Sequence, residues 1–168
     1  MDMNKIQIDV LTPFSCENEE FKNIIEKNGG RVFIGNNDFN KNRKKAFNKY
    51  VDKFLKEHHH KIVHIQSGSI YELMMGSKIA SENGIKNIIV HSHCGGFPNL
   101  KYKVIKKISA PILSKYPTEY WACSELAAKW KFPEDIINQG KHKIIKNAID
   151  TSKFYYSEEL RNKTRKHL

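Results

Sequence analysis

Segments with the pattern of β-strands alternate with segments patterned as amphipathic helices along almost the whole chain, and this alternation constrains the fold most. Residues 88–90, Ile-Ile-Val, form a continuous apolar run typical of a strand buried on both faces. Segments with helical spacing of apolar residues lie before and after this run, joined by short loops. Repeated strand–helix units of this kind predict an α/β fold with a mainly parallel sheet.

The predicted elements follow one another without an internal repeat or an interdomain linker. The predicted strands are residues 5–11, 31–35, 61–66, 86–91, 119–123 and 142–146. The predicted helices are residues 18–28, 41–57, 70–82, the stretch after 99 up to 115 with an interruption at Pro111, 124–130 and 158–168.

Length and composition agree with one compact domain. The chain has 168 residues, of which 39% are hydrophobic, enough for a buried core. No apolar run approaches the roughly 20 residues that span a bilayer, and the first residues lack the pattern of a signal peptide. Cys16, Cys94 and Cys123 are widely spaced, which favours a reducing compartment over a disulfide framework. We therefore expect a cytoplasmic protein.

The net charge of +11 comes from 29 Lys and Arg residues against 18 Asp and Glu residues. Only four of the basic residues are Arg, the side chain best suited to bidentate phosphate binding. The charge therefore reflects either drift in an AT-rich genome or a preference for an anionic lipid, nucleotide or nucleic acid. Residues 41–56 concentrate lysines on one predicted helix, whose basic face is either solvated or in contact with an anionic membrane.

Ligands of parallel α/β sheets bind at the carboxyl ends of the strands, and the segment 91–96 follows the most apolar strand. Its sequence is His-Ser-His-Cys-Gly-Gly. The histidines can hydrogen-bond to a phosphate or a sugar hydroxyl, and Gly95 and Gly96 allow such a group to approach the backbone. Two alternatives to ligand binding stay open: structural histidines, or a metal site formed by His91, His93 and Cys94, for which the spacing is a weak signature.

The remaining candidate residues each have a structural role to weigh beside the functional one. Ser67 and Gly68 end the strand that contains His64, itself a lone strand histidine of the kind that usually belongs to a core. Ser124 can cap the helix that follows it or contact a ligand at the amino end of that helix. Residues 58–60, His-His-His, can bind metal but better suit the exposed end of a basic helix.

Several enzyme classes are disfavoured because their motifs are missing from the sequence. The chain contains no G-x-x-x-x-G-K-[ST] loop, no G-x-S-x-G elbow and no G-x-G-x-x-G fingerprint. A P-loop NTPase, an elbow-type serine hydrolase and an NAD dehydrogenase are therefore disfavoured.

Four stretches, in order along the chain, resemble the amino-terminal half of a family 4-type glycosyltransferase of the capsular and exopolysaccharide kind. Residues 61–64, Lys-Ile-Val-His, resemble that family's "DIVH-x-H" strand end, and residues 84–93 resemble its "GI…IVHSH" strand. Residues 122–132 resemble "ACS…AA.W.FG", and residues 147–154 resemble "NGID…F".

The resemblance implies a Rossmann-like three-layer sandwich that forms one lobe of a GT-B fold. Residues 1–150 would be this amino-terminal domain, and residues 151–168 would begin the segment leading to the second lobe. It implies a UDP-sugar as co-substrate, with no other cofactor and no metal, and a lipid-linked saccharide as acceptor. His93 would contact the donor, while Gly95, Gly96, Ser67, Gly68 and Ser124 would line the same cleft. The location implied is the cytoplasm, at the inner face of the plasma membrane.

The sequence also departs from the family pattern. Gln66 replaces the second histidine after His64, Ala148 replaces a glycine, and Pro133 replaces the glycine after Phe132. The family's first strand and glycine-rich loop have no counterpart before Lys5, and its second lobe has none in these residues. We therefore expect a fragment or half of a split enzyme, which needs a carboxyl-terminal lobe or partner chain for catalysis. The alternative is a non-catalytic module that binds an anionic membrane or nucleic acid, the latter supported by charge alone.

Overall fold

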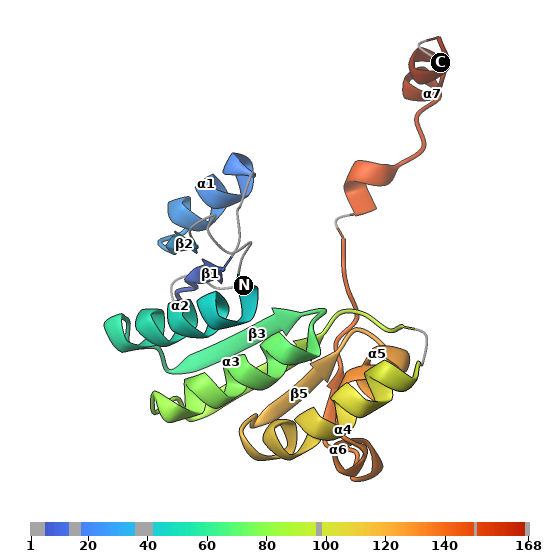
Figure 1. Ribbon diagram of the computed structural model, residues 1–168. Helices are drawn as coiled ribbons and strands as arrows, with labels where there is room; N and C mark the ends of the chain where they lie inside the picture. The colour runs from blue at the N-terminus through green and yellow to red at the C-terminus, as the bar shows by residue number, and fades with distance from the viewer. Residues whose placement is uncertain (1–5, 14–17, 36–41, 97–98, 150, 167–168) are drawn as a thin grey trace.

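A computed structural model of the protein describes residues 6–13, 18–35, 42–96, 99–149 and 151–166 (Figure 1). The strands are β1 (Val10–Thr12), β2 (Val32–Ile34), β3 (Ile62–Ser67), β4 (Asn87–Ser92), β5 (Glu119–Ala122) and β6 (His142–Ile144). The helices are α1 (Glu19–Lys27), α2 (Arg43–Glu57), α3 (Ile70–Glu82), α4 (Leu100–Lys115), α5 (Glu125–Lys131), α6 (Glu134–Asn138), the 3-10 helix η2 (Thr151–Phe154) and α7 (Glu158–Arg165). The predicted α/β class with parallel strands is confirmed.

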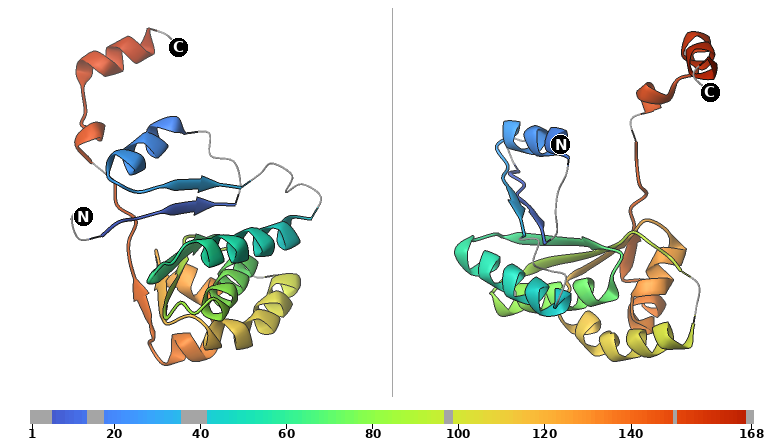
Figure 2. Two further views of the ribbon diagram at one scale, coloured as in Figure 1. Left: turned by 90° about the vertical axis from the view of Figure 1, so that its left-hand side faces the viewer. Right: turned by 45° about the horizontal axis from the view of Figure 1, so that its top comes forward.

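The strands form two separate parallel sheets, a division that the sequence did not predict. The larger sheet has the order β3-β4-β5-β6, and β1 pairs with β2 in the smaller sheet. Figure 2 shows the smaller sheet, drawn in blue, standing apart from the larger one. Each described strand of the larger sheet pairs with the next strand along the chain, as expected for successive strand–helix units.

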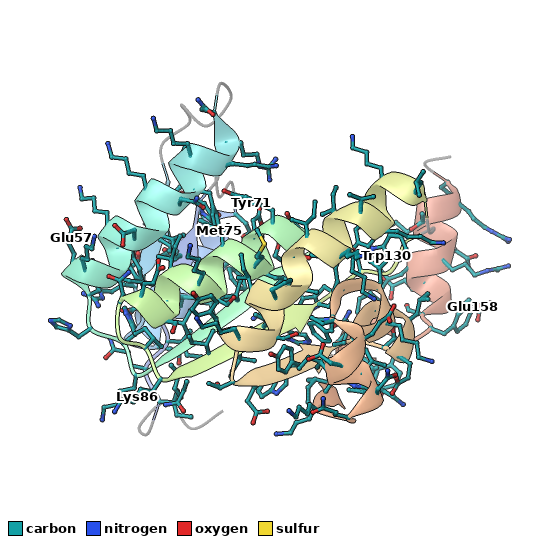
Figure 3. The ribbon with its side chains drawn as sticks, turned by 60° about the horizontal axis from the view of Figure 1, so that its bottom comes forward. Glu57, Tyr71, Met75, Lys86, Trp130 and Glu158 are labelled. Atoms are coloured by element: carbon teal, nitrogen blue, oxygen red, sulfur yellow. The ribbon has the colours of Figure 1, made fainter. Side chains whose placement is uncertain are left out.

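Helices α2, α3 and α4 lie across one face of the larger sheet (Figure 3). The core beneath them contains Leu73 from α3, Val90 from β4, Leu113 from α4 and the fully buried Phe132 that follows α5. The outward-pointing residues of β3 are exposed, in keeping with the alternation of side chains along a strand. The uncovered side of the sheet therefore displays side chains of β3 and β4 to solvent.

Helix α4 continues through Pro111, so the predicted interruption of this helix is wrong. Proline removes one backbone donor, which leaves the carbonyl of Lys107, four residues earlier, without its helical partner. Both residues are exposed, so water can bond to that carbonyl at little cost. The start of the helix is conventional, because Asn99 accepts a hydrogen bond from the backbone of Tyr102 at 2.8 Å.

Smaller differences from the predicted elements occur near the two ends of the chain and after α5. The first strand begins at Val10 rather than at residue 5, which lies outside the described residues, and the short α6 and η2 were not predicted. No described helix is both long enough and apolar enough to cross a membrane. Helix α7 has no buried residue and stands away from the sheets in both Figure 1 and Figure 2. The proposed boundary near residue 150 stays a prediction.

Candidate functional site

The carboxyl ends of β3, β4 and β5 meet at one edge of the larger sheet. The strand register aligns Gln66 with His91 and Ser67 with Ser92, and it aligns His91 with Trp121 on the other side. Side chains two residues apart on a strand share a face. His64, Gln66, His91, His93 and Trp121 therefore gather on the side of the sheet that no described helix covers.

The rings of the three histidines of this group, His64, His91 and His93, follow one another in a row that we call the histidine cluster. The Nε2 atom of His64 lies 3.1 Å from Nδ1 of His91, and their rings are stacked with centroids 5.3 Å apart. The ring of His93 follows, with its centroid 4.1 Å from that of His91. Trp121 lies edge-on beside both His64 and His91, which closes the cluster on the β5 side.

Desolvation keeps His64 and His91 of the cluster neutral. Desolvation lowers the pKa of His91 to about 4, with smaller contributions from the neighbouring His93 and His64. Desolvation also lowers the pKa of His64, again with a smaller contribution from His93. At neutral pH these two imidazoles therefore donate and accept hydrogen bonds without carrying charge.

The hydrogen bond between His64 and His91 also restricts the tautomer of His91. The Nε2 atom of His91 is buried and has no hydrogen-bond partner. A buried N–H without an acceptor costs more than a bare ring lone pair. The favoured arrangement therefore has Nδ1–H of His91 donating to Nε2 of His64, which leaves Nε2 of His91 unprotonated.

Gln66 holds the outermost histidine in place. The Nε2 atom of the half-buried His93 lies 3.0 Å from Oε1 of Gln66. Gln66 stands where the resembled family has its second histidine, and no local pattern around it indicates a contact with His93. Cross-strand register is the only signal that could have found this pair, because residues of neighbouring strands at the same edge lie within side-chain reach.

Lys131 is a site residue that the sequence pattern did not reveal. Its side chain is almost fully buried, with 3% exposed, and its ammonium group donates a 2.5 Å hydrogen bond to the carbonyl of Gly68. The thiol of Cys94 lies 3.5 Å from the same carbonyl, and the ammonium group lies 5.2 Å from the centre of the Tyr102 ring. Desolvation lowers the pKa of Lys131, while Cys94 opposes that shift. This lysine ties the Gly68 loop to α5.

The two predicted serines take part in the local architecture. The Oγ atom of Ser67 donates to Glu72 at 2.7 Å and accepts from the backbone of Ser69 at 2.9 Å. The Oγ atom of Ser124 caps α5 by accepting from the backbone of Ala127 at 3.2 Å. The predicted capping role of Ser124 is thus present in the structure, and contact of either serine with a ligand stays a prediction.

The paired glycines are required by packing against α5. A Cβ atom on Gly96 would lie 2.7 Å from the ring of Trp130, and a Cβ atom on Gly95 would lie 3.0 Å from Leu126. Trp130 itself is stacked on Tyr102 with ring centroids 3.9 Å apart, so it has little freedom to move. Gly96 therefore allows the loop to pack closely against Trp130, a role that the sequence did not predict.

The histidines at the end of α2 serve structural roles. The ring of His58 packs against Phe33 and Phe54, and His60 bonds to Asp9 at 3.1 Å. His59 alone is exposed. Within the described ranges, no three His, Cys, Asp or Glu side chains come together as a potential metal site.

Comparisons with known proteins identify the fold. Neither a protein-family model nor a characterised protein sequence matches the chain. The crystal structure of HepE from Anabaena in complex with UDP-glucose is similar to it, with a TM-score of 0.56 at 16% sequence identity. The similarity covers 88% of this chain but only 39% of the HepE chain. At this identity it shows the fold alone, and it confirms the Rossmann-like α/β architecture.

Proposed function

We propose that the chain is the acceptor-side lobe of a retaining GT-B glycosyltransferase that moves a sugar from a nucleotide-sugar to a lipid-linked saccharide in surface-polysaccharide synthesis. The observation that carries the proposal is the histidine cluster at the carboxyl edge of the sheet. HepE, a protein with a similar fold, was crystallised with UDP-glucose. The ordered sequence stretches at residues 61–64, 84–93, 122–132 and 147–154 point to the same class.

The cluster suits a sugar better than a phosphate. His64 and His91 are neutral at neutral pH, so they offer hydrogen bonds rather than positive charge. The hydrogen bond to Gln66 fixes the orientation of the His93 ring. The other ring nitrogen of His93 has no hydrogen-bond partner among the described residues. His93 would therefore contact the sugar of a UDP-sugar, while Ser67, Gly68, Gly95, Gly96 and Ser124 would shape the surrounding loops.

A cleft between α4 and α5 supports an amphiphilic, phosphate-bearing acceptor. Its volume is about 780 Å³, and its walls include the aromatic rings of Tyr102 and Trp130 and the exposed side chain of Leu126. Four lysines also line it, namely Lys103, Lys106, Lys107 and Lys129, and they outnumber its two acidic residues, Glu134 and Asp135. Exposed apolar residues continue from the cleft along α4, where Leu100 is 80% exposed and Ile108 is 70% exposed. Lysines beside apolar side chains match a diphosphate joined to a lipid chain.

The first experiment measures chemical-shift changes in the 168-residue protein during titration with UDP-glucose, UDP and glucose. We expect UDP-glucose to perturb residues 64–66 and 91–96, and UDP alone to perturb them less. His93→Ala should weaken the response at least tenfold, whereas His59→Ala, at an exposed site away from the cluster, should not. A response that is unchanged in His93→Ala overturns the assignment. In the complete enzyme, His93→Ala should lower kcat/KM at least tenfold without loss of folding.

The second experiment measures sedimentation with vesicles of phosphatidylglycerol or phosphatidylcholine. We expect binding to the anionic vesicles, and Ile108→Glu on α4 should weaken it at least tenfold. Phe21→Glu is the matched control, because Phe21 is also exposed, at 54%, but lies on α1. Equal binding by both variants contradicts a membrane role of α4.

Helix α2, which the sequence favoured for anionic contacts, uses part of its charge locally. Lys56 bonds to Asp52 at 2.7 Å, Lys53 lies 3.7 Å from Glu57, and Lys44 lies over the ring of Tyr71. Lys41 lies outside the described residues. Binding of an oligonucleotide that persists at about 200 mM salt would favour the nucleic-acid alternative over the transferase, because purely electrostatic binding weakens steeply with salt.

A further inference from the structure

Lys131 buries an ammonium group without a carboxylate partner among the described residues. The residue is 3% exposed, and no described Asp or Glu side chain forms an ion pair with it. The ammonium group bonds instead to the carbonyl of Gly68 at 2.5 Å. Burial removes the hydration of a charged group, so an ammonium ion held in this way is costly. Loss of its proton relieves that cost.

The thiol of Cys94 is a second reactive group beside Gly68. Its Sγ atom lies 3.5 Å from the same carbonyl oxygen, and a Cβ atom on Gly68 would lie 3.2 Å from Sγ. The ammonium group of Lys131 also hydrogen-bonds to Cys94. Cys94 is half-buried, whereas Lys131 is buried. A sulfur that a small solute can reach therefore lies in contact with a nitrogen that is shielded from solvent.

The environment of Lys131 favours the reactive form of its amine. Desolvation lowers the pKa of Lys131, and the charge and hydrogen bond of Cys94 oppose that shift. A lower pKa raises the fraction of unprotonated amine, whose lone pair can attack an electrophile. The nearest group that can become electrophilic is the sulfur of Cys94, once it is oxidised.

We propose that Lys131 and Cys94 form an oxidation site, at which hydrogen peroxide converts their contact into a covalent bond between Nζ and Sγ. The sulfur first attacks one oxygen of the peroxide, and the O–O bond breaks. The second oxygen leaves as water with the thiol proton, so the sulfur is oxidised by two electrons to a sulfenic acid. Unprotonated Nζ then attacks this sulfur. The new S–N bond replaces the S–O bond, and the hydroxyl group leaves with one amine hydrogen as a second water.

The bond joins two elements at the carboxyl edge of the larger sheet. Cys94 directly follows His93 in the segment after β4, and Lys131 is the last residue of α5. A thiol reductant reverses the reaction by attack on the sulfur, which releases the amine. The proposal rests on the contact between these two side chains and does not depend on the nucleotide-sugar function.

Peptide mapping by mass spectrometry after treatment with hydrogen peroxide tests the bond. The protein carries Cys16→Ser, because Cys16 lies outside the described residues and would add a further thiol. We expect the peptides that contain Cys94 and Lys131 to be joined and to be two hydrogen atoms lighter than the separate pair. Dithiothreitol should restore the separate peptides. Cys123 is an internal control, because it is also half-buried but packs against the hydrophobic core, and its linked peptides should be at least tenfold rarer.

Two matched variants test the role of the amine. Arginine stays protonated and cannot attack the sulfur, so Lys131→Arg should lower the yield of linked peptide at least tenfold. Lys129→Arg, at an exposed residue of the same helix, should leave the yield unchanged. If Lys131→Arg does not fold, the peptide map of the protein with Lys131 intact decides alone.

Three results would each overturn the proposal: a sulfenic or sulfinic acid on Cys94 beside an unlinked Lys131, a disulfide between Cys94 and Cys123, or a link that retains an oxygen atom. None of these results alters the expected response to UDP-glucose, so the two proposals fail separately.

Discussion

The two sheets of this protein have the same strand direction but differ in how they are stabilised. The larger sheet has helices packed on one face, and its core includes residues with no exposed surface, such as Leu73 and Phe132. In the smaller sheet each strand has three residues, and none of the residues in β1, β2 or α1 is buried. Phe33 of β2 packs against Phe54 of α2 with ring centroids 4.8 Å apart.

This difference shows that strand pattern alone does not decide stability. An isolated two-stranded unit is marginal in water, because it buries too little apolar surface to offset its loss of conformational entropy. The smaller sheet is held by Phe33, by Leu11 and by the polar contacts of Asp9.

A substitution in the core of the larger sheet should destabilise the protein most. Phe132→Ala should lower the free energy of unfolding by about 3–5 kcal/mol, because it leaves a cavity at a fully buried position. Phe33→Ala, in the smaller sheet, should cost roughly half as much because Phe33 is only half-buried. Urea denaturation followed by circular dichroism measures both. Equal losses would contradict the difference between the two sheets.

Asp9→Asn should lower the free energy of unfolding of the smaller sheet by about 2 kcal/mol. The carboxylate accepts hydrogen bonds from the backbone and guanidinium of Arg31 and contacts His60. These bonds, with that of the Arg31 side chain first, lower the pKa of Asp9 to about 2. Hydrogen exchange should accelerate in β1 and β2 and stay unchanged in β4. Faster exchange across β4 would mean that the two sheets unfold as one unit.

Gly96→Ala should destabilise the carboxyl edge by about 1–2 kcal/mol, because its Cβ would meet a tryptophan held by stacking. Gly95→Ala is the matched control and should cost less, because its Cβ would meet the end of the flexible, exposed Leu126 side chain. Thermal unfolding compares the two variants. A larger loss for Gly95→Ala would show that Trp130 can move aside.

A weaker effect concerns the loss of stability in acid. The folded pKa of His91, about 4, lies below its ordinary value of 6.5, so protons bind the unfolded chain preferentially. Stability is therefore complete above pH 6.5 and falls as the pH drops towards 4. Solvent near the cluster limits the loss to about 1 kcal/mol. Titration of Asp9 affects stability at lower pH, and its contribution is lost as the pH falls from 3.8 towards 2.

Urea titrations between pH 7 and 4 test this contribution. His91→Asn keeps a hydrogen-bonding group near His64 but does not titrate, so its stability should change less over this range than that of the wild type. The same pH slope in both proteins would show that His91 is not responsible.

The individual elements and the class of fold follow from local patterns of residues. Period-two and helical spacing of apolar residues depend on neighbours along the chain, so β3, α3, β4 and β5 lie within a residue or two of their predicted positions. The caps at Ser69, Asn99 and Ser124 are likewise local. Local sequence also marked His93 as a candidate, because it directly follows a buried strand.

Contacts between distant segments, in contrast, depend on how the whole chain packs. The contact of His93 with Gln66, the burial of Lys131 beneath Gly68 and the closeness of Gly96 to Trp130 each join segments far apart in sequence. The division into two sheets is also a long-range property, because it depends on which strand edges find a partner rather than on strand propensity. Local pattern specifies an element, whereas pairing and burial between distant elements specify the site.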